Sequence, residues 1–119
     1  MTVNAEKQLE EQLGYNLKRQ GFKVVAQKGF SQRFHWKPDF IIERSGKHVV
    51  LEVKSRPAMM PDISVVGQIK HAGLVGTLLC MPPDALERIP GSVQSYAQQL
   101  KVRLCSTNDI EDVLNELLN

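Results

Sequence analysis

Residues 38–54 read PDFIIERSGKHVVLEVK, and the rest of the predicted fold is arranged around this segment. Two short apolar runs flank Ser45-Gly46, which is typical of two strands joined by a tight turn. The sequence therefore predicts paired strands over residues 38–44 and 47–54. Residues 49–51 (VVL) form the most apolar run, so we expect the second strand to lie inside the sheet.

Asp39, Glu52 and Lys54 are charged residues at the outer ends of these two apolar runs. Side chains alternate along a strand, so Glu52 and Lys54 leave the same face and Val53 points into the packing on the other. Charged groups in an apolar setting are costly unless they are paired or bind a metal. Asp39 and Glu52 also carry the oxygen ligands that Mg²⁺ prefers. The alternative is an exposed ion pair between Glu52 and Lys54, which would be weak and structural.

The segment before the paired strands predicts an amphipathic helix over residues 4–20. Ala5, Leu9, Leu13 and Leu17 recur every four residues, Asn4 is a suitable N-cap, and Gly21 ends the helix. At about 100° per residue, Glu6 and Glu10 project within or at the edge of the apolar stripe. This helix therefore carries two acids on or beside the face that it should bury.

The rest of the chain predicts further elements in an alternating order. We expect a strand over 22–27, a loop over 28–37, a helix from Asp62 to about His71, a strand over 77–81, a turn or short helix over 82–89, a helix over 92–100, a strand over 102–105, and a final helix capped by Thr107. The order is α-β-β-β-α-β-α-β-α. Consecutive strands can form an antiparallel meander, and strands reached through a helix should lie parallel by right-handed crossover. The predicted fold is an α/β sandwich with a central mixed sheet flanked by helices.

Composition indicates one soluble globular domain over residues 1–119. The chain is 42% hydrophobic and 24% charged. Cys80 and Cys105 lie in apolar runs, which favours core residues in a reducing compartment over a disulfide. No apolar run approaches the roughly 20 residues of a membrane helix, and the N-terminus has no secretory pattern. We therefore expect a cytoplasmic protein with no membrane partner and no small-molecule cofactor.

Positive charge is concentrated near the candidate site. Residues 15–56 contain ten Lys/Arg and three Asp/Glu, a balance of +7 in a chain whose net charge is +2. Such a surface attracts a polyanion. The basic and aromatic residues of 28–37 suit a phosphate backbone and an exposed base, although Phe34 and Trp36 could instead pack in the core. The candidate nucleic-acid contacts are Arg33, His35, Trp36, Lys37, Arg56 and Lys70.

Three spaced patterns resemble one known family. The first helix contains Glu10-x-x-Leu13-x-x-x-Leu17-x-x-x-Gly21-Phe22, Asp39 follows a proline, and the second strand of the pair ends in Glu52-Val53-Lys54-Ser55. Together they resemble the PD-(D/E)xK nuclease superfamily, which has the restriction-endonuclease-like fold. Within it, they look most like archaeal-type Holliday junction resolvases. The resemblance covers about residues 6–72, and the last third agrees only in element order.

The resemblance implies a metal-dependent DNA endonuclease that uses Mg²⁺ or Mn²⁺. Asp39, Glu52 and the Val53 carbonyl would bind the metal, Glu10 would complete its shell, and Glu6 is the alternative to Glu10. Lys54 would orient the attacking water, and Gln68 on the following helix would contact phosphate or metal-bound water. A homodimer would suit two cuts across one DNA. The alternatives are a non-catalytic nucleic-acid-binding module, an RNA endonuclease, and a nuclease subunit of a larger transposition or restriction complex.

Overall fold

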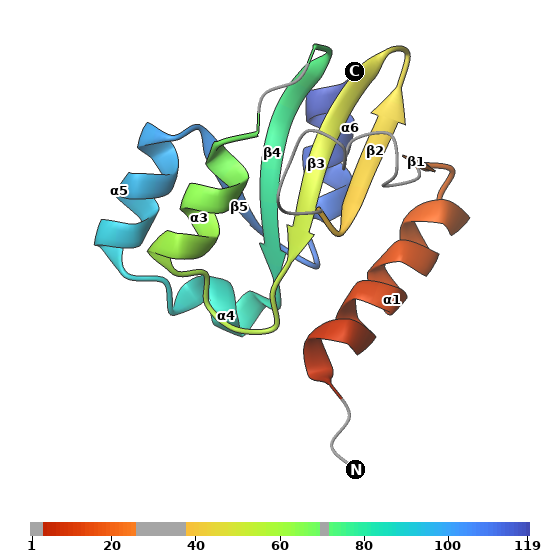
Figure 1. Ribbon diagram of the computed structural model, residues 1–119. Coiled ribbons are helices and arrows are strands. Elements are labelled where there is room, and N and C mark those ends of the chain that lie inside the picture. Colours follow the sequence, from red (N-terminus) through yellow and green to blue (C-terminus); the bar gives the residue numbers. More distant parts are fainter. Residues whose placement is uncertain (1–3, 26–37, 70–71) are drawn as a thin grey trace.

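The computed structural model describes residues 4–25, 38–69 and 72–119. Its centre is a mixed sheet with helices on both faces (Figure 1). The sheet comprises β1 (Lys23–Val25), β2 (Phe40–Arg44), β3 (Lys47–Val53), β4 (Leu74–Met81) and β5 (Val102–Ser106), which lie side by side in chain order. The first three strands pair antiparallel, and β4 and β5 continue the sheet parallel to β3. This arrangement confirms the predicted α/β fold, with a meander followed by parallel crossovers.

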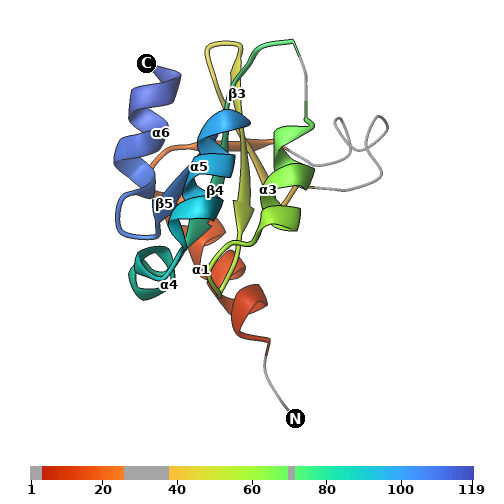
Figure 2. The same cartoon turned by 90° about the vertical axis from the view of Figure 1, so that its left-hand side faces the viewer.

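The helices form one layer on each face of the sheet. On one face, α1 (Ala5–Arg19) and α6 (Ile110–Leu118) share a core with β3 and β4. On the other, α3 (Met60–Gly67), α4 (Pro83–Glu87) and α5 (Gly91–Gln99) enclose a second core against β4 and β5. Figure 2 shows α6 and α3 on opposite sides of the sheet. Within the described residues, every helix is too short or too polar to cross a membrane.

The turn between β2 and β3 sets the register on which the candidate site depends. Ser45 and Gly46 have φ angles of 54° and 79°, and two consecutive positive φ angles are typical of a tight hairpin turn that matches strand twist. In the resulting register Phe40 lies opposite Leu51. Asp39, one residue before Phe40, therefore comes opposite Glu52, at the end of the hairpin away from its turn.

The predicted core residues largely lie where the periodicity placed them. Leu13 and Leu17 of α1 are buried and Leu9 packs partly buried against the same cluster, whereas Ala5, predicted on the same stripe, is exposed in the first turn of the helix. Asn4 caps α1, because its side-chain oxygen accepts hydrogen bonds from the backbone N–H groups of Glu6 (3.0 Å) and Lys7 (3.2 Å). The helix ends before Gly21, whose φ of 91° is outside the helical region.

The predicted boundaries of three elements were wrong. Helix α3 begins at Met60, because Pro61 fits the first turn and Asp62 caps from inside the helix, and it ends at Gly67. The strand predicted over 77–81 starts at Leu74, since its first residues pair with β3 despite their weak apolar pattern. The N-cap of α6 is Asp109 and not Thr107.

Cys80 and Cys105 are core residues, as predicted. Both are buried with free thiols, and they are paired neighbours on β4 and β5. A hydrogen bond with the Cys105 side chain, together with burial, raises the pKa of the Cys80 thiol. A group held in its neutral form in this way contributes to packing in the same manner as a small apolar side chain.

Candidate carboxylate and lysine site

Asp39 and Glu52 lie opposite each other at the end of the β2–β3 pair, and each carboxylate accepts a hydrogen bond from the backbone of the opposite segment. The Asp39 backbone N–H donates to Glu52 Oε1 (3.2 Å), and the Val53 backbone N–H donates to Asp39 Oδ2 (2.8 Å). These bonds tie each carboxylate to the opposite strand and fix both side chains. They use one oxygen of each carboxylate.

Glu52 is the most deeply buried acid of the candidate site, with 6% of its surface exposed. Burial raises the pKa of Glu52 to about 9, with further contributions from a hydrogen bond with the Asp39 side chain and from its negative charge. The positive charge of Lys54 opposes this rise in pKa but does not cancel it. Two carboxylates thus lie close together with too little positive charge to keep both ionised.

Glu10 joins this pair from a different part of the chain. Helix α1 passes the end of the sheet where β2 begins and β3 ends (Figure 1). Burial raises the pKa of Glu10, and the charge of Asp39 and a hydrogen bond with its side chain add to the shift. Glu10, Asp39 and Glu52 therefore form one carboxylate cluster, built from a helix and two strands.

Glu6, the alternative to Glu10, has another position. It lies one turn earlier on α1, and its Oε1 accepts a hydrogen bond from the Ser55 backbone N–H (3.2 Å). Its Oε2 lies 3.9 Å from Lys54 Nζ. The structure thus brings Glu10 to the carboxylate cluster and Glu6 to the lysine.

Lys54 follows β3 and lies between two carboxylates. Besides Glu6, its ammonium nitrogen lies 3.9 Å from Asp62 Oδ1, and 18% of its side chain is exposed. These described ion pairs, together with the burial of Glu52, contradict the alternative of a simple exposed pair between Glu52 and Lys54. Asp62 also binds Arg56, which is 47% exposed at the edge of the site.

The contact of Asp62 with Lys54 was not predicted from the sequence, which placed Asp62 only at the start of a helix. Asp62 is eight positions after Lys54, and no periodic pattern links a strand end to the first turn of the next helix. The available signal was Asp62 itself, an acid placed soon after two basic residues, Lys54 and Arg56. Local sequence could not show that the chain reverses between them.

Some of the remaining predicted site residues lie in the described part of the chain, and the others lie outside it. Gln68 is exposed at the C-terminal end of α3, whereas Asp62, at the other end of this helix, is the residue that contacts Lys54. Val53 is buried, and its N–H is bound by Asp39. The other predicted nucleic-acid contacts lie outside the described residues: Arg33, His35, Trp36, Lys37 and Lys70.

The donor atoms of the carboxylate cluster suit a hard cation, because they are carboxylate oxygens drawn from a partly buried setting. Within residues 4–25, 38–69 and 72–119, however, no group of three His, Cys, Asp or Glu side chains is already arranged around one metal position. The carboxyl groups of Glu10 and Glu52 instead hydrogen-bond with Asp39. Metal binding would therefore require these hydrogen bonds to be exchanged for bonds to the ion.

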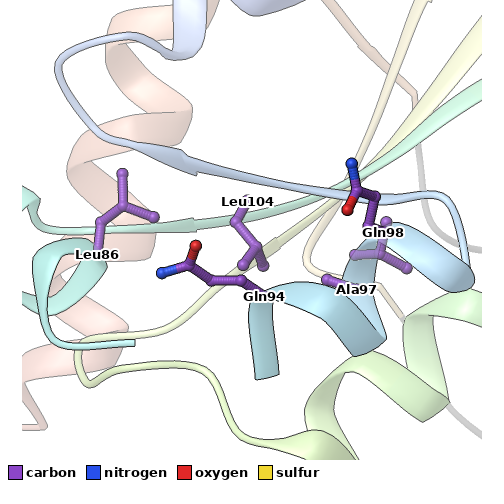
Figure 3. A pocket seen from close by; sticks show the side chains of 6 residues that line it. Leu86, Gln94, Ala97, Gln98 and Leu104 are labelled. Atoms are coloured by element: carbon purple, nitrogen blue, oxygen red, sulfur yellow. The ribbon is translucent and has the colours of Figure 1, made fainter. Parts of the chain in front are cut away.

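One surface pocket lies away from the candidate site, and another borders it. One, with a volume of about 400 Å³, lies between α4, α5 and β5 (Figure 3) and is lined by Leu86, Gln94, Ala97, Gln98, Val102 and Leu104. Among the described residues its lining has no ionisable group, and β4 lies between its strand β5 and β3. The other, of about 320 Å³, is lined by Glu10, Glu11, Gly14, Tyr15, Lys18 and Phe40 and borders the carboxylate cluster through Glu10.

Comparisons with known proteins support the fold and do not identify an activity. No protein-family model matches the chain, and no curated protein matches it. Among solved structures, SfsA from Pyrococcus furiosus in complex with Ca²⁺ is similar, with a TM-score of 0.51 and 14% sequence identity. The match covers 84% of this chain and 54% of SfsA, so the chain spans about half the length of that protein. At this identity the likeness shows the α/β fold alone.

Proposed function

We propose that this α/β protein is a metal-dependent nuclease that hydrolyses phosphodiester bonds in DNA. The observation that carries the proposal is the convergence of Glu10, Asp39 and Glu52 from three separate segments at one end of the sheet. Lys54, two residues after Glu52, adds an ammonium group at the same end. Clustered carboxylates beside a lysine match the requirements of phosphoryl chemistry with a divalent cation.

Glu10, Asp39 and Glu52 are the residues that would hold Mg²⁺ or Mn²⁺, with the Val53 carbonyl as a further oxygen donor. When bound, the ion would supply Lewis acidity and lower the pKa of a bound water. The chain's contribution is orientation, because a backbone N–H group donates to one oxygen of Asp39 and another donates to one oxygen of Glu52. An ion there would also balance the negative charge that now raises the pKa of Glu52.

Lys54 and Arg56 would act on the substrate. The Lys54 ammonium would orient the attacking water and stabilise negative charge on the phosphate in the transition state. Arg56 is exposed next to Lys54 and would bind a neighbouring phosphate of the backbone. A homodimer would place two such sites on one duplex and allow both strands to be cut.

A non-catalytic nucleic-acid-binding protein is the second candidate. The specific observation in its favour is that Asp39 and Glu52 each accept a hydrogen bond from a backbone N–H group, and that the described residues contain no group of three such side chains arranged around a metal position. In that case the acids stabilise the end of the hairpin, and the basic residues bind phosphate. Such a protein would bind DNA in a salt-dependent manner with no effect of a divalent metal.

Cleavage assays on purified protein separate the two candidates. We expect cleavage of branched or duplex DNA with Mg²⁺ or Mn²⁺, and at least about 100-fold slower cleavage by Lys54→Met, since a positioned acid–base group contributes about 10²–10⁴-fold. Lys7→Met, which removes an exposed lysine from α1, is the control and should cleave like wild type. Equal cleavage by Lys54→Met, or full activity in EDTA, would contradict the proposal. Parallel single-stranded DNA and RNA substrates establish which nucleic acid is cut.

A further inference from the structure

Asp62 is the centre of a small ionic network at the edge of the candidate site. Its Oδ2 lies 2.8 Å from Arg56 Nη1, and its Oδ1 lies 3.1 Å from Arg56 Nη2, so the guanidinium is bound through two parallel hydrogen bonds. Oδ2 also accepts the Met59 backbone N–H (2.8 Å), and Oδ1 lies 3.9 Å from Lys54 Nζ. Only 12% of the Asp62 side chain is exposed. One carboxylate thus contacts both cations that follow β3.

Both the charge and the orientation of the Asp62 carboxylate are fixed by its neighbours. Burial would raise the pKa of Asp62, but the hydrogen bonds from Arg56 and Met59 and the charges of Arg56 and Lys54 outweigh it and lower this pKa. The residue lies in the first turn of α3, where the helix dipole also favours a negative charge. A bidentate arginine–carboxylate pair restricts orientation as well as distance. Asp62 is therefore a fixed negative charge at neutral pH.

Lys54 has a second fixed neighbour on its other side. Glu6 lies 3.9 Å from Lys54 Nζ and is anchored by the Ser55 backbone N–H. The ammonium group is thereby held between one carboxylate from α1 and one from α3. A lysine side chain has four flexible carbons, so without such neighbours its charge would occupy many positions.

From this geometry we propose that Asp62 is a positioning residue that fixes the Lys54 ammonium and the Arg56 guanidinium for the substrate phosphate. This inference rests on the proposed nuclease function and adds a residue to it. Asp62 acts through its neighbours and does not touch the reacting atoms. Misplacement of a reacting group by about 1 Å can lower a rate about 10²-fold, so loss of the anchor should lower turnover while substrate still binds.

The kinetic test uses Asp62→Asn, which keeps a side-chain oxygen for the Met59 N–H and removes the negative charge. We expect kcat to fall about 10- to 100-fold and KM to change less than about threefold, because the basic residues that bind phosphate remain. Asp62→Glu, which restores the charge, should recover part of kcat. The control is Glu116→Gln, which removes an exposed ion pair with Arg103 (3.0 Å) and should leave both constants unchanged.

A second measurement tests the positioning without nuclease activity. Acetylation of lysines by an N-hydroxysuccinimide ester, followed by mass spectrometry, should modify Lys54 several-fold faster in Asp62→Asn than in wild type. Lys7 and Lys101, both exposed, should react equally in the two proteins. If Asp62→Asn matches wild type in kcat, or in the rate of Lys54 acetylation, the positioning role is wrong. A wild type that cleaves no nucleic acid with any metal overturns the proposed function, and the catalytic part of this inference with it.

Discussion

Asp39→Asn is expected to lower the rate of DNA cleavage at least about 10³-fold without unfolding the protein. Asp39 is the central member of the carboxylate cluster, because its side chain hydrogen-bonds with both Glu10 and Glu52. An asparagine retains an oxygen that can accept the Val53 N–H, so the contact between the two strands survives. The variant loses the negative charge that a divalent cation requires, and with it the charge stabilisation that such an ion provides.

The effect of Asp39→Asn is measured as a single-turnover rate in Mn²⁺, together with a urea unfolding curve. Asp84→Asn is the matched control, since it makes the same chemical change at an exposed aspartate on α4 that pairs with Arg88. The control should cleave like wild type. If Asp39→Asn retains wild-type cleavage and the same unfolding midpoint, the carboxylate cluster is not the catalytic centre.

Glu52→Gln is expected to change how stability depends on pH. Burial raises the pKa of Glu52 in the folded protein to about 9, from its ordinary value of 4.5. Between these two values the folded state holds the proton and the unfolded state releases it, so the free energy of unfolding falls as pH rises. Below pH 4.5 Glu52 is protonated in both the folded and the unfolded state, so its contribution to the free energy of unfolding is fully present and no longer changes with pH. A glutamine side chain does not ionise in this range, so the free energy of unfolding of the variant should not show this decrease with pH.

In metal-free buffer, Glu52→Gln should therefore be more stable than wild type at pH 8, by about 1–3 kcal/mol. At pH 4 this advantage should be absent. Urea unfolding at several pH values in EDTA measures the difference, and an unchanged m-value shows that the same transition is followed. Mn²⁺ should restore wild-type stability at pH 8, because a ligand of the folded state stabilises it. Parallel pH profiles for the two proteins would contradict a buried, protonated Glu52.

The hairpin and the first helix could be predicted because their determinants are local. Ser45-Gly46 supplies the two positive φ angles that the turn requires, and the turn then sets the register that brings Asp39 opposite Glu52. The leucines of the first helix follow its 3.6-residue period, so their burial could also be predicted from the sequence. In both elements, neighbours in sequence determine the structure.

The arrangement around Lys54 could not be predicted in the same way. Glu6 and Glu10 are one turn apart on α1 and project to nearly the same side, so the helical pattern did not separate their roles. Which carboxylate meets Asp39 and which meets Lys54 depends on how α1 is placed against the end of β3. Asp62 reaches Lys54 only because the chain reverses into α3. These contacts are products of tertiary packing.

Calorimetric titration of Mn²⁺ into the metal-free protein measures directly whether Glu10, Asp39 and Glu52 form a metal site. We predict saturable binding by wild type and at least about tenfold weaker binding by Asp39→Asn, since one charged oxygen ligand of a hard cation is lost. Asp84→Asn should bind Mn²⁺ like wild type, and Ca²⁺ provides a second hard cation for the same titration. Heats equal to dilution for wild type, or equal affinity for wild type and Asp39→Asn, would contradict a metal site formed by Glu10, Asp39 and Glu52.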